Sequence, residues 1–166
     1  MTEMLPIVDD QDKVIGKKTR DEVEKKAMLH RSANVIIEDS NGMIFVHQRK
    51  KDKFYYPGLW DIKVGGAVQY HESYLEAAKR ELAEEAGING VSLKFLFSEK
   101  YRSKEHNTNR QVYLCTWDGP IKIQKEEIEQ GRFMSLDEID ALHDQLSPTA
   151  KVILKLYRQN AKKNRP

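Results

Sequence analysis

Three glutamates within one turn of a predicted helix constrain this chain more than any other feature of its sequence. Glu81, Glu84 and Glu85 are spaced i, i+3 and i+4, so at roughly 100° per residue their side chains share one face. Crowded carboxylates repel one another, and a divalent cation would turn that repulsion into affinity. Hard oxygen ligands of this kind suit Mg²⁺, with Mn²⁺ as the alternative. Taken alone, this spacing fits an exposed acidic face, since Glu is a good helix former. The flanking glycines, Arg80 and Glu72 favour a helix that carries a metal site.

Glycines bound this helix, which is predicted over residues 73–86. Gly87 follows the last helical residue and is the residue type that most easily adopts the left-handed cap. Gly65 and Gly66 lie in a predicted short loop before the helix, where missing side chains let the backbone approach a metal or a phosphate. The metal site is therefore expected between that loop and the helix.

A helical wheel separates an apolar stripe from the acids. The stripe contains Leu75, Ala78 and Leu82. The three glutamates fan away from it in the order Glu85, Glu81 and Glu84. This order predicts that the acids begin at the edge of the buried face and lead toward solvent, at the lip of a cleft.

Glu72 and Arg80 are spaced so that a loop residue can reach back to the helix. A planar guanidinium can hold a carboxylate bidentately, and we interpret Arg80 as an orienting residue rather than a substrate binder. Glu72 also has a purely structural interpretation, because a glutamate near a helix N-terminus is favoured by the helix dipole.

Residues 66–88 read G-x5-E-x7-R-E-U-x-E-E-x-G-U, where U is apolar. This run resembles the Nudix box and matches it at every constrained position. The resemblance implies an α+β fold, the Nudix αβα sandwich around a mixed β-sheet. It also implies that Glu81, Glu84 and Glu85 are metal ligands, with the backbone carbonyl of Gly66 as a further ligand.

The same resemblance implies a hydrolase acting on acid anhydrides, a Nudix pyrophosphohydrolase. Its substrate class would be a nucleoside diphosphate linked to another group, or a related diphosphate, and its cofactor Mg²⁺. The general base in this family varies, and the candidates are Glu81, Glu84 and Glu127. Glu127 is similar to a family glutamate that precedes a Trp or Phe strand, but it also fits a solvated loop rich in lysine and glutamate.

Outside the box, the chain is similar to isopentenyl-diphosphate isomerases, a Nudix branch that rearranges its substrate. The similarity extends from about residue 8 to residue 133 and rests on residues 29–31, 48–49 and 56–60. That branch has a catalytic Cys-Gly-His where this chain has residues 65–67, Gly-Gly-Ala. Its second pair of glutamates falls near Asn109 and Gln111. The chain is therefore identified with an isomerase-shaped subgroup of bacterial Nudix hydrolases that lacks the catalytic cysteine.

Two alternative functions stay open. One is an isomerase-like enzyme, for which His30 is the single matching ligand; His30 also fits a hydrogen-bonded structural residue. The other is a non-catalytic nucleotide-binding Nudix module. Such modules commonly lose box acids, and this chain retains them.

The overall composition narrows the class of partner. Lys and Arg number 28 against 26 Asp and Glu, giving a formal net charge of +2. This balance argues against a dedicated nucleic-acid or membrane surface, and we expect a small-molecule diphosphate as partner, with a homodimer left open. One cysteine, Cys115, in a predicted buried strand indicates a reducing compartment, and the polar N-terminus does not resemble a signal peptide. We expect a cytoplasmic protein.

The length of 166 residues predicts one Nudix domain over residues 1–166. Residues 1–29 are expected to form a β-hairpin and helix extension. Further strands are predicted over residues 32–37, 43–49, 91–97, 112–117 and 132–134, with a helical turn over 136–142 and a last helix from about residue 147. Asn41 and Gly42 predict a hairpin between the first two of these strands.

Several stretches could contribute to substrate binding. Residues 49–53 form a basic run that is either a phosphate-attracting patch or a solvated loop. Residues 100–110 are either a substrate loop or a mobile connection. Trp60 is expected to be a core anchor rather than a stacking surface. The sequence leaves open which tyrosines stack on a substrate and which only pack; the candidates are Tyr55, Tyr56, Tyr70 and Tyr101.

Overall fold

The structure is a computed structural model and describes residues 2–164. Its elements follow in the order β1 (Met4–Val8), β2 (Val14–Thr19), α1 (Arg20–Lys25), β3 (His30–Glu38), β4 (Ile44–Arg49), β5 (Trp60–Asp61), β6 (Val64–Ala67), α2 (Tyr74–Ala86), β7 (Lys94–Arg102), β8 (Asn107–Thr116), β9 (Ile128–Met134), α3 (Leu136–Ala141), a single 3-10 turn (His143–Gln145) and α4 (Pro148–Lys163). None of the helices within residues 2–164 has the length and apolar character needed to cross a membrane.

Strand β3 organises the mixed sheet. It pairs in parallel with β8 along its whole length, from His30 opposite Thr108 to Glu38 opposite Thr116. Three antiparallel partners share its other edge, with β1 at His30, β6 from Ser32 to Val35 and β4 at Glu38. Because α2 follows β6 directly, this pairing places the start of the box beside the middle of β3.

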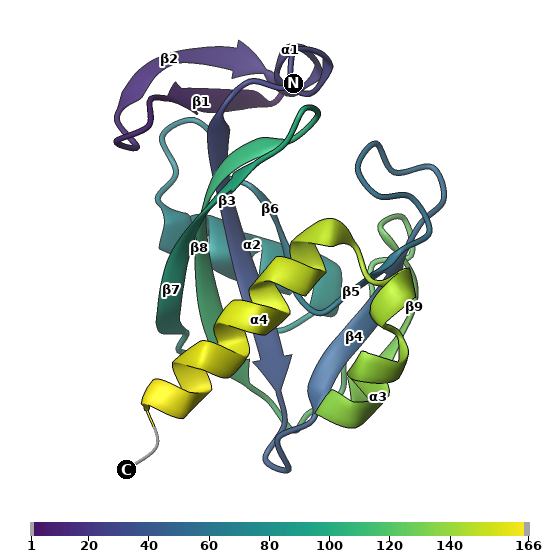
Figure 1. The fold of residues 1–166 in the computed structure, drawn as a ribbon. Coiled ribbons are helices and arrows are strands. Elements are labelled where there is room, and N and C mark those ends of the chain that lie inside the picture. The colour runs from purple at the N-terminus through teal and green to yellow at the C-terminus, as the bar shows by residue number, and fades with distance from the viewer. Residues whose placement is uncertain (1, 165–166) are drawn as a thin grey trace.

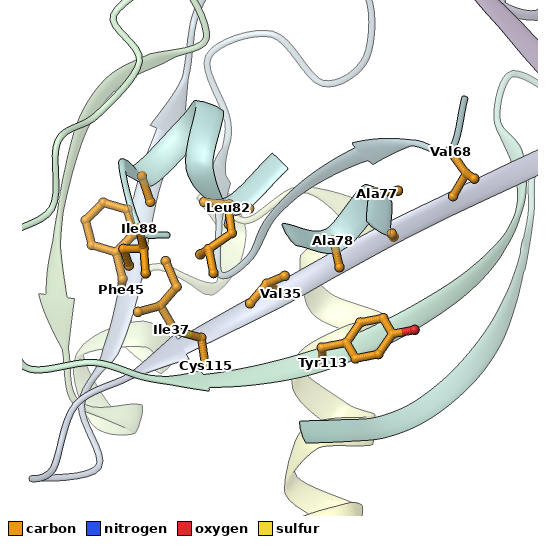
Figure 2. Packing of buried hydrophobic residues seen from close by; sticks show 13 residues of the cluster. Val35, Ile37, Phe45, Val68, Ala77, Ala78, Leu82, Ile88, Tyr113 and Cys115 are labelled. Atoms are coloured by element: carbon orange, nitrogen blue, oxygen red, sulfur yellow. The ribbon is translucent and has the colours of Figure 1, made fainter. Parts of the chain in front are cut away.

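Helices cover both faces of the sheet, as the predicted αβα sandwich requires (Figure 1). Helix α2 packs on the face that carries Val35 and Ile37 of β3, and Figure 2 shows Ala78 and Leu82 of α2 turned toward these side chains. Helix α4 packs on the opposite face, where Ile153 meets Ile36 of β3. Alternate residues of β3 therefore belong to different cores, and the predicted fold class is confirmed.

The structure confirms the predicted hairpin turn but limits the pairing that follows it. Asp39 accepts hydrogen bonds from the backbone amides of Asn41 and Met43, and Gly42 has a positive φ of 77°. Strands β3 and β4 then pair only at Glu38 and Ile44. Beyond this point the two strands diverge, because β3 pairs with β6 and β4 pairs with β9. No local signal in the hairpin specifies these partners.

Two sequence-based expectations about loops are wrong. Residues 64–67 form strand β6 rather than a loop, because Gly65 and Gly66 pair with Asn34 and Ala33 of β3. Residues 100–110 are mostly the ends of the β7–β8 hairpin, in which Glu99 lies opposite Arg110. The structure of that stretch is therefore a paired hairpin, and its role in substrate binding stays a prediction.

The extension over residues 1–29 contains the predicted hairpin and helix and is fastened to the rest of the chain by Asp12. This residue has a positive φ of 64°, and its carboxylate accepts hydrogen bonds from Tyr74 at 3.0 Å, Asn109 at 3.0 Å and Arg31 at 3.1 Å. The extension lies beside the His30 end of β3 (Figure 1). It therefore forms one wall of the space next to that strand.

Candidate active site

A cavity of about 710 Å³ opens between the extension, the sheet and helix α2. Its walls come from the extension, β3, the end of β4 and the segment after it, β6, α2, the β7–β8 hairpin, the turn before β9 and the start of α4. The lining includes Glu3, Arg20, His30, Arg49, Tyr55, Lys63, Gly66, Arg80, Glu81, Glu84, Glu85, His106, Arg110 and Glu127. Every predicted metal ligand therefore borders a single space.

Helix α2 is held at both ends by local signals. Ser73 accepts a hydrogen bond from the amide of Glu76, whose carboxylate accepts one from the amide of Ser73, which is a capping box. Gly87 ends the helix in the left-handed conformation with a φ of 69°, as predicted. The caps fix where α2 begins and ends. The rotation of the helix about its axis then determines which of its glutamates face the cavity.

The three box glutamates differ in exposure. Glu81 and Glu85 are buried, with 7% and 9% of their surface exposed, whereas the side chain of Glu84 is 49% exposed. The predicted order from buried to exposed is correct in outline, but the acids lie deeper than the lip of a cleft. Leu75, assigned by the helical wheel to the buried stripe, is 40% exposed. The buried face of α2 is therefore rotated toward Ala77 and Glu81.

Gly66 makes room for one of these carboxylates. A Cβ atom at this position would lie 2.6 Å from Oε1 of Glu81, so any larger residue would displace that group. The neighbouring amide of Gly65 donates a hydrogen bond to Oε2 of Glu85 at 3.3 Å. Strand β6 thus contacts both buried acids, although it does so as a strand and not as a loop.

Arg80 joins the acids into one network. Its guanidinium holds both carboxylate oxygens of Glu72, at 2.8 Å and 3.0 Å, in the predicted bidentate pair. It also donates to Glu81 at 2.6 Å, to Glu84 at 3.4 Å and to the carbonyl of Ala67 at 3.1 Å. The hydrogen bonds to Glu72 raise the pKa of Arg80 above its usual value. This geometry suits an orienting residue.

Burial raises the pKa of both inward glutamates. For Glu85 the main cause is loss of solvent, followed by the negative charge of Glu81. For Glu81 loss of solvent outweighs the opposing effect of Arg80. Two acids that are costly to ionise together would gain from a cation placed between them. Oxygen donors with raised pKa values and a glycine beside them fit a divalent cation.

The acids are not arranged as a finished metal centre. Within residues 2–164, no three histidine, cysteine, aspartate or glutamate side chains converge into a ready-made cluster. Arg80 contacts Glu81 and Glu84 instead, and its positive charge partly replaces that of a cation. A metal bound here would therefore compete with Arg80 for Glu81 and Glu84.

Glu127 also reaches this cavity and forms an ion pair with Lys53. Its charge adds to the negative potential at Glu85. In the basic run at residues 49–53, Arg49 and Lys53 line the cavity, whereas Lys50 pairs with Glu129. The run therefore divides between the cavity and the surface, and neither of its two sequence interpretations describes all of it.

Aromatic side chains form a wall near the β7–β8 hairpin. The rings of Tyr55 and His106 stack with centroids 3.9 Å apart. The hydroxyl of Tyr56 donates to that of Tyr101 at 3.3 Å and lies 3.2 Å from Nδ1 of His106. Tyr70 lies apart from this cluster, beneath the ammonium group of Lys17.

His30, the single isomerase-type ligand, lies beside this aromatic wall. Its Nδ1 lies 2.8 Å from the carbonyl of Met28, and burial lowers its pKa to about 4. Asn109 donates to Asp12, and Gln111 accepts from Tyr113, so both of the residues that stand where the isomerases have glutamates have structural partners. Trp60 packs against the core below α4, as expected.

Sequence reasoning missed two charged groups that border the cavity, Asp61 and Lys63, and considered a third, Arg110, only as part of the stretch 100–110. Arg110 of β8 lies opposite Ser32 of β3. Because side chains alternate between the two faces of a sheet, this register indicates on which face Arg110 lies. The alternation becomes informative only once the pairing of β3 with β8 is known.

Comparison with known proteins agrees with this description. The NUDIX domain model matches residues 28–157. The chain is 30% identical over 163 residues to the uncharacterized Nudix hydrolase YfcD of Escherichia coli (strain K12), covering 98% of this chain and 91% of that protein. It is 33% identical to the uncharacterized Nudix hydrolase PA4841 of Pseudomonas aeruginosa, covering 93% of each.

A solved structure shows the same fold over nearly the whole chain. The crystal structure of DR0079 from Deinococcus radiodurans superposes with a TM-score of 0.82 at 25% identity, covering 93% of this chain and 99% of that one. The family model includes α2 with the box acids and most of the sheet. From the match of this model and the identity to two relatives, the chain belongs to the Nudix hydrolase family.

Proposed function

We propose that this protein is a Mg²⁺-dependent hydrolase that cleaves a phosphoanhydride bond in a nucleoside diphosphate-linked or related diphosphate substrate. The observation that carries the proposal is the pair of buried carboxylates, Glu81 and Glu85, contacted by the glycine strand β6 at the wall of a cavity. A cavity of about 710 Å³ is within the range of small-molecule sites.

Glu81 and Glu85 would hold the metal, with Glu84 and the carbonyl of Gly66 completing the set. Bound Mg²⁺ would supply positive charge where negative charge develops on the phosphoryl oxygens. Arg80 fixes the carboxylate of Glu81 through a 2.6 Å hydrogen bond, and Glu72 fixes Arg80 in turn. The acids thus keep their positions without help from solvent.

Hydrolysis needs a group that takes a proton from the attacking water. The water oxygen forms a bond to phosphorus, the anhydride P–O bond breaks, and the phosphate-bearing fragment leaves with the electron pair. Glu81, Glu84 and Glu127 border the cavity and can each accept the proton. Lys53 is paired with Glu127, so this acid would have to exchange that ion pair for the water.

We also propose that the protein works in the cytoplasm. Its cysteine, Cys115, is free and buried, and burial raises the pKa of its thiol, which keeps it unreactive.

The test is release of phosphate-containing products from a panel of nucleoside diphosphate derivatives, dinucleotides and isopentenyl diphosphate, with Mg²⁺ or Mn²⁺. Wild type is compared with Glu85→Gln, which keeps the shape but loses the charge. We expect metal-dependent hydrolysis of at least one compound and a loss of at least about 100-fold in the variant, about 3 kcal/mol. Glu76→Gln, an exposed acid of the same helix, is the matched control for charge removal and should retain activity.

Two outcomes would overturn the proposal. Tight binding of a nucleotide without turnover of any compound would indicate a non-catalytic module. Rearrangement of isopentenyl diphosphate would indicate an isomerase that works without the missing cysteine.

A further inference from the structure

Arg110 is a buried cation whose hydrogen bonds are incomplete. Only 3% of its surface is exposed, and it borders the cavity. Its Nε donates to the hydroxyl of Thr108 at 2.8 Å, and its guanidinium lies 4.5 Å from the ring centre of Tyr101. Nη1 has no hydrogen-bond partner within residues 2–164. Thr108 and Tyr101 therefore hold the guanidinium in place, while Nη1 can still donate a hydrogen bond to a ligand.

The acid nearest to Arg110 does not satisfy it. Oε2 of Glu99, on the paired strand β7, lies 3.6 Å from Nη1, which is beyond hydrogen-bond distance for a well-formed ion pair. This oxygen is buried and also lacks a partner among the described residues. Unsatisfied buried charges are costly, so an arrangement of this kind is expected where a ligand supplies the missing contacts.

The position of Arg110 relative to the box acids indicates how a ligand would lie in the cavity. Arg110 lies opposite Ser32 of β3, on the face of the sheet away from Val35 and helix α2, so Arg110 and the box acids border the cavity from different faces of the sheet. The Lys63 side chain is 10% exposed and lies 3.4 Å from Asp61, and Arg49 adds a further positive charge to the same space. The cavity thus runs from an acidic end at α2 to a basic end at β8.

We propose that Arg110 binds a second anionic group of the substrate, a phosphate monoester remote from the bond that is cleaved. This proposal rests on the proposed function in taking the acidic end as the place of hydrolysis. The substrate class becomes a diphosphate compound that carries a further phosphate. A guanidinium with free donors matches the oxygens of that phosphate, and its burial strengthens the contact.

The first test measures binding of inorganic phosphate by calorimetry to the full chain in EDTA, where turnover does not occur. We expect one phosphate per chain, with affinity at least tenfold weaker in Arg110→Gln. Glu99→Gln should bind phosphate several-fold more tightly, because the competing carboxylate is removed. Arg132→Gln, which removes an exposed charge outside the cavity lining, should bind as wild type does.

Arg110→Gln removes the cation paired with Glu99 and should lower stability for that reason alone. The double variant Glu99→Gln/Arg110→Gln removes both charges and should also bind phosphate at least tenfold more weakly than wild type. Wild-type affinity in the double variant, or no tightening in Glu99→Gln, would show that Arg110 serves only as the partner of Glu99 and would overturn the proposal.

The second test compares hydrolysis of paired compounds that differ by one phosphate monoester, such as NADPH with NADH and coenzyme A with its dephospho form. Wild type should prefer the phosphorylated member by at least tenfold in kcat/KM, and the double variant should show a ratio near one. Turnover with no preference, together with phosphate binding that ignores Arg110, would remove this inference and leave the hydrolase intact. Phosphate binding that depends on Arg110, with no turnover of any compound, would support this inference and overturn the proposed hydrolysis.

Discussion

Gly65 and Gly66 are adjacent in strand β6, but an added methyl group would meet a different neighbour at each. At Gly65 it would lie 2.2 Å from the backbone carbonyl oxygen of Ala33, and the φ of 147° disfavours any other residue. At Gly66 it would lie 2.6 Å from the end of the Glu81 side chain. The first glycine permits strand pairing, and the second determines where a carboxylate rests.

This difference predicts that alanine at position 66 lowers activity more than stability, whereas alanine at position 65 mainly lowers stability. Gly66→Ala should lower the free energy of unfolding by less than about 1 kcal/mol, because the carboxylate of Glu81 can move, while kcat falls at least about tenfold. Gly65→Ala should cost more than about 2 kcal/mol, because backbone atoms must shift. Urea unfolding and steady-state kinetics separate the two. Equal losses of stability would show that Gly66 also supports the strand.

Removal of the charge on Glu85 should stabilise the protein in the absence of metal. Its pKa is raised by burial and by Glu81, so ionisation of this group works against folding at neutral pH. Glu85→Gln should therefore have a higher Tm than wild type in EDTA, even though it is inactive. A lower Tm would indicate that the amide of Gly65 depends on the charged form.

At the scale of elements, Asp12 fastens the N-terminal extension to three separate parts of the chain. It holds Tyr74 of helix α2, Asn109 of strand β8 and Arg31 of strand β3 through one carboxylate. Because the extension supplies Glu3 and Arg20 to the cavity lining, these contacts also keep one wall in place. The extension belongs to the site and does not merely decorate the core.

Asp12→Asn tests this connection and can keep the positive φ of 64°, since asparagine tolerates it. We expect a loss of about 1 kcal/mol and faster amide hydrogen exchange in β1 and β2, because the hydrogen bonds from Tyr74 and Asn109 become neutral and Arg31 loses its ion pair. Asp10→Asn is the matched control, as Asp10 is exposed and contacts Arg102 at 3.4 Å. Unchanged exchange in both variants would show that strand pairing alone holds the extension.

Local signals account for the elements that could be predicted. Ser73 and Gly87 mark the ends of α2 because capping depends on neighbours within four residues. Strand β6 could not be found in this way, since two adjacent glycines have no side chains to alternate. Likewise Leu75 fits a helical stripe on a wheel, but the packing of Ala77 on β3 decides the rotation of the helix.

At the scale of the whole molecule, the site combines a motif that is contiguous in sequence with groups that are not. The box acids, Arg80 and Glu72 could be predicted because they share one helix and its preceding loop. Lys63 could not, and Arg110 could be considered only within the stretch 100–110, because these residues line one cavity only when strands distant in the chain pair. The cavity lies where the extension, the sheet and α2 come together, and no single segment specifies it.

The pH dependence of metal binding follows from the burial of the acids. Burial raises the pKa of Glu81 and Glu85, so the folded protein keeps protons that the unfolded chain loses above about pH 4.5. Their contribution to stability therefore falls as pH rises through the raised pKa values, and Mg²⁺ bound as proposed would have to displace the same protons. The increase in Tm caused by excess Mg²⁺ should be larger at about pH 8 than at about pH 6.

Thermal unfolding with Mg²⁺ and with EDTA at each pH measures this effect. Glu85→Gln should show a smaller increase that depends less on pH. An increase in wild type that is the same across this range would mean that the acids are already ionised before metal binds.

The parallel pairing of β3 with β8 also has a consequence for folding. It joins residues about eighty positions apart, from His30 opposite Thr108 onward, and contacts between distant residues form slowly because a long loop must close first. During synthesis the acidic helix α2 leaves the ribosome before β8 and Arg110 do. The box acids are thus synthesised before Arg110, and Arg110 joins the cavity only when β3 pairs with β8.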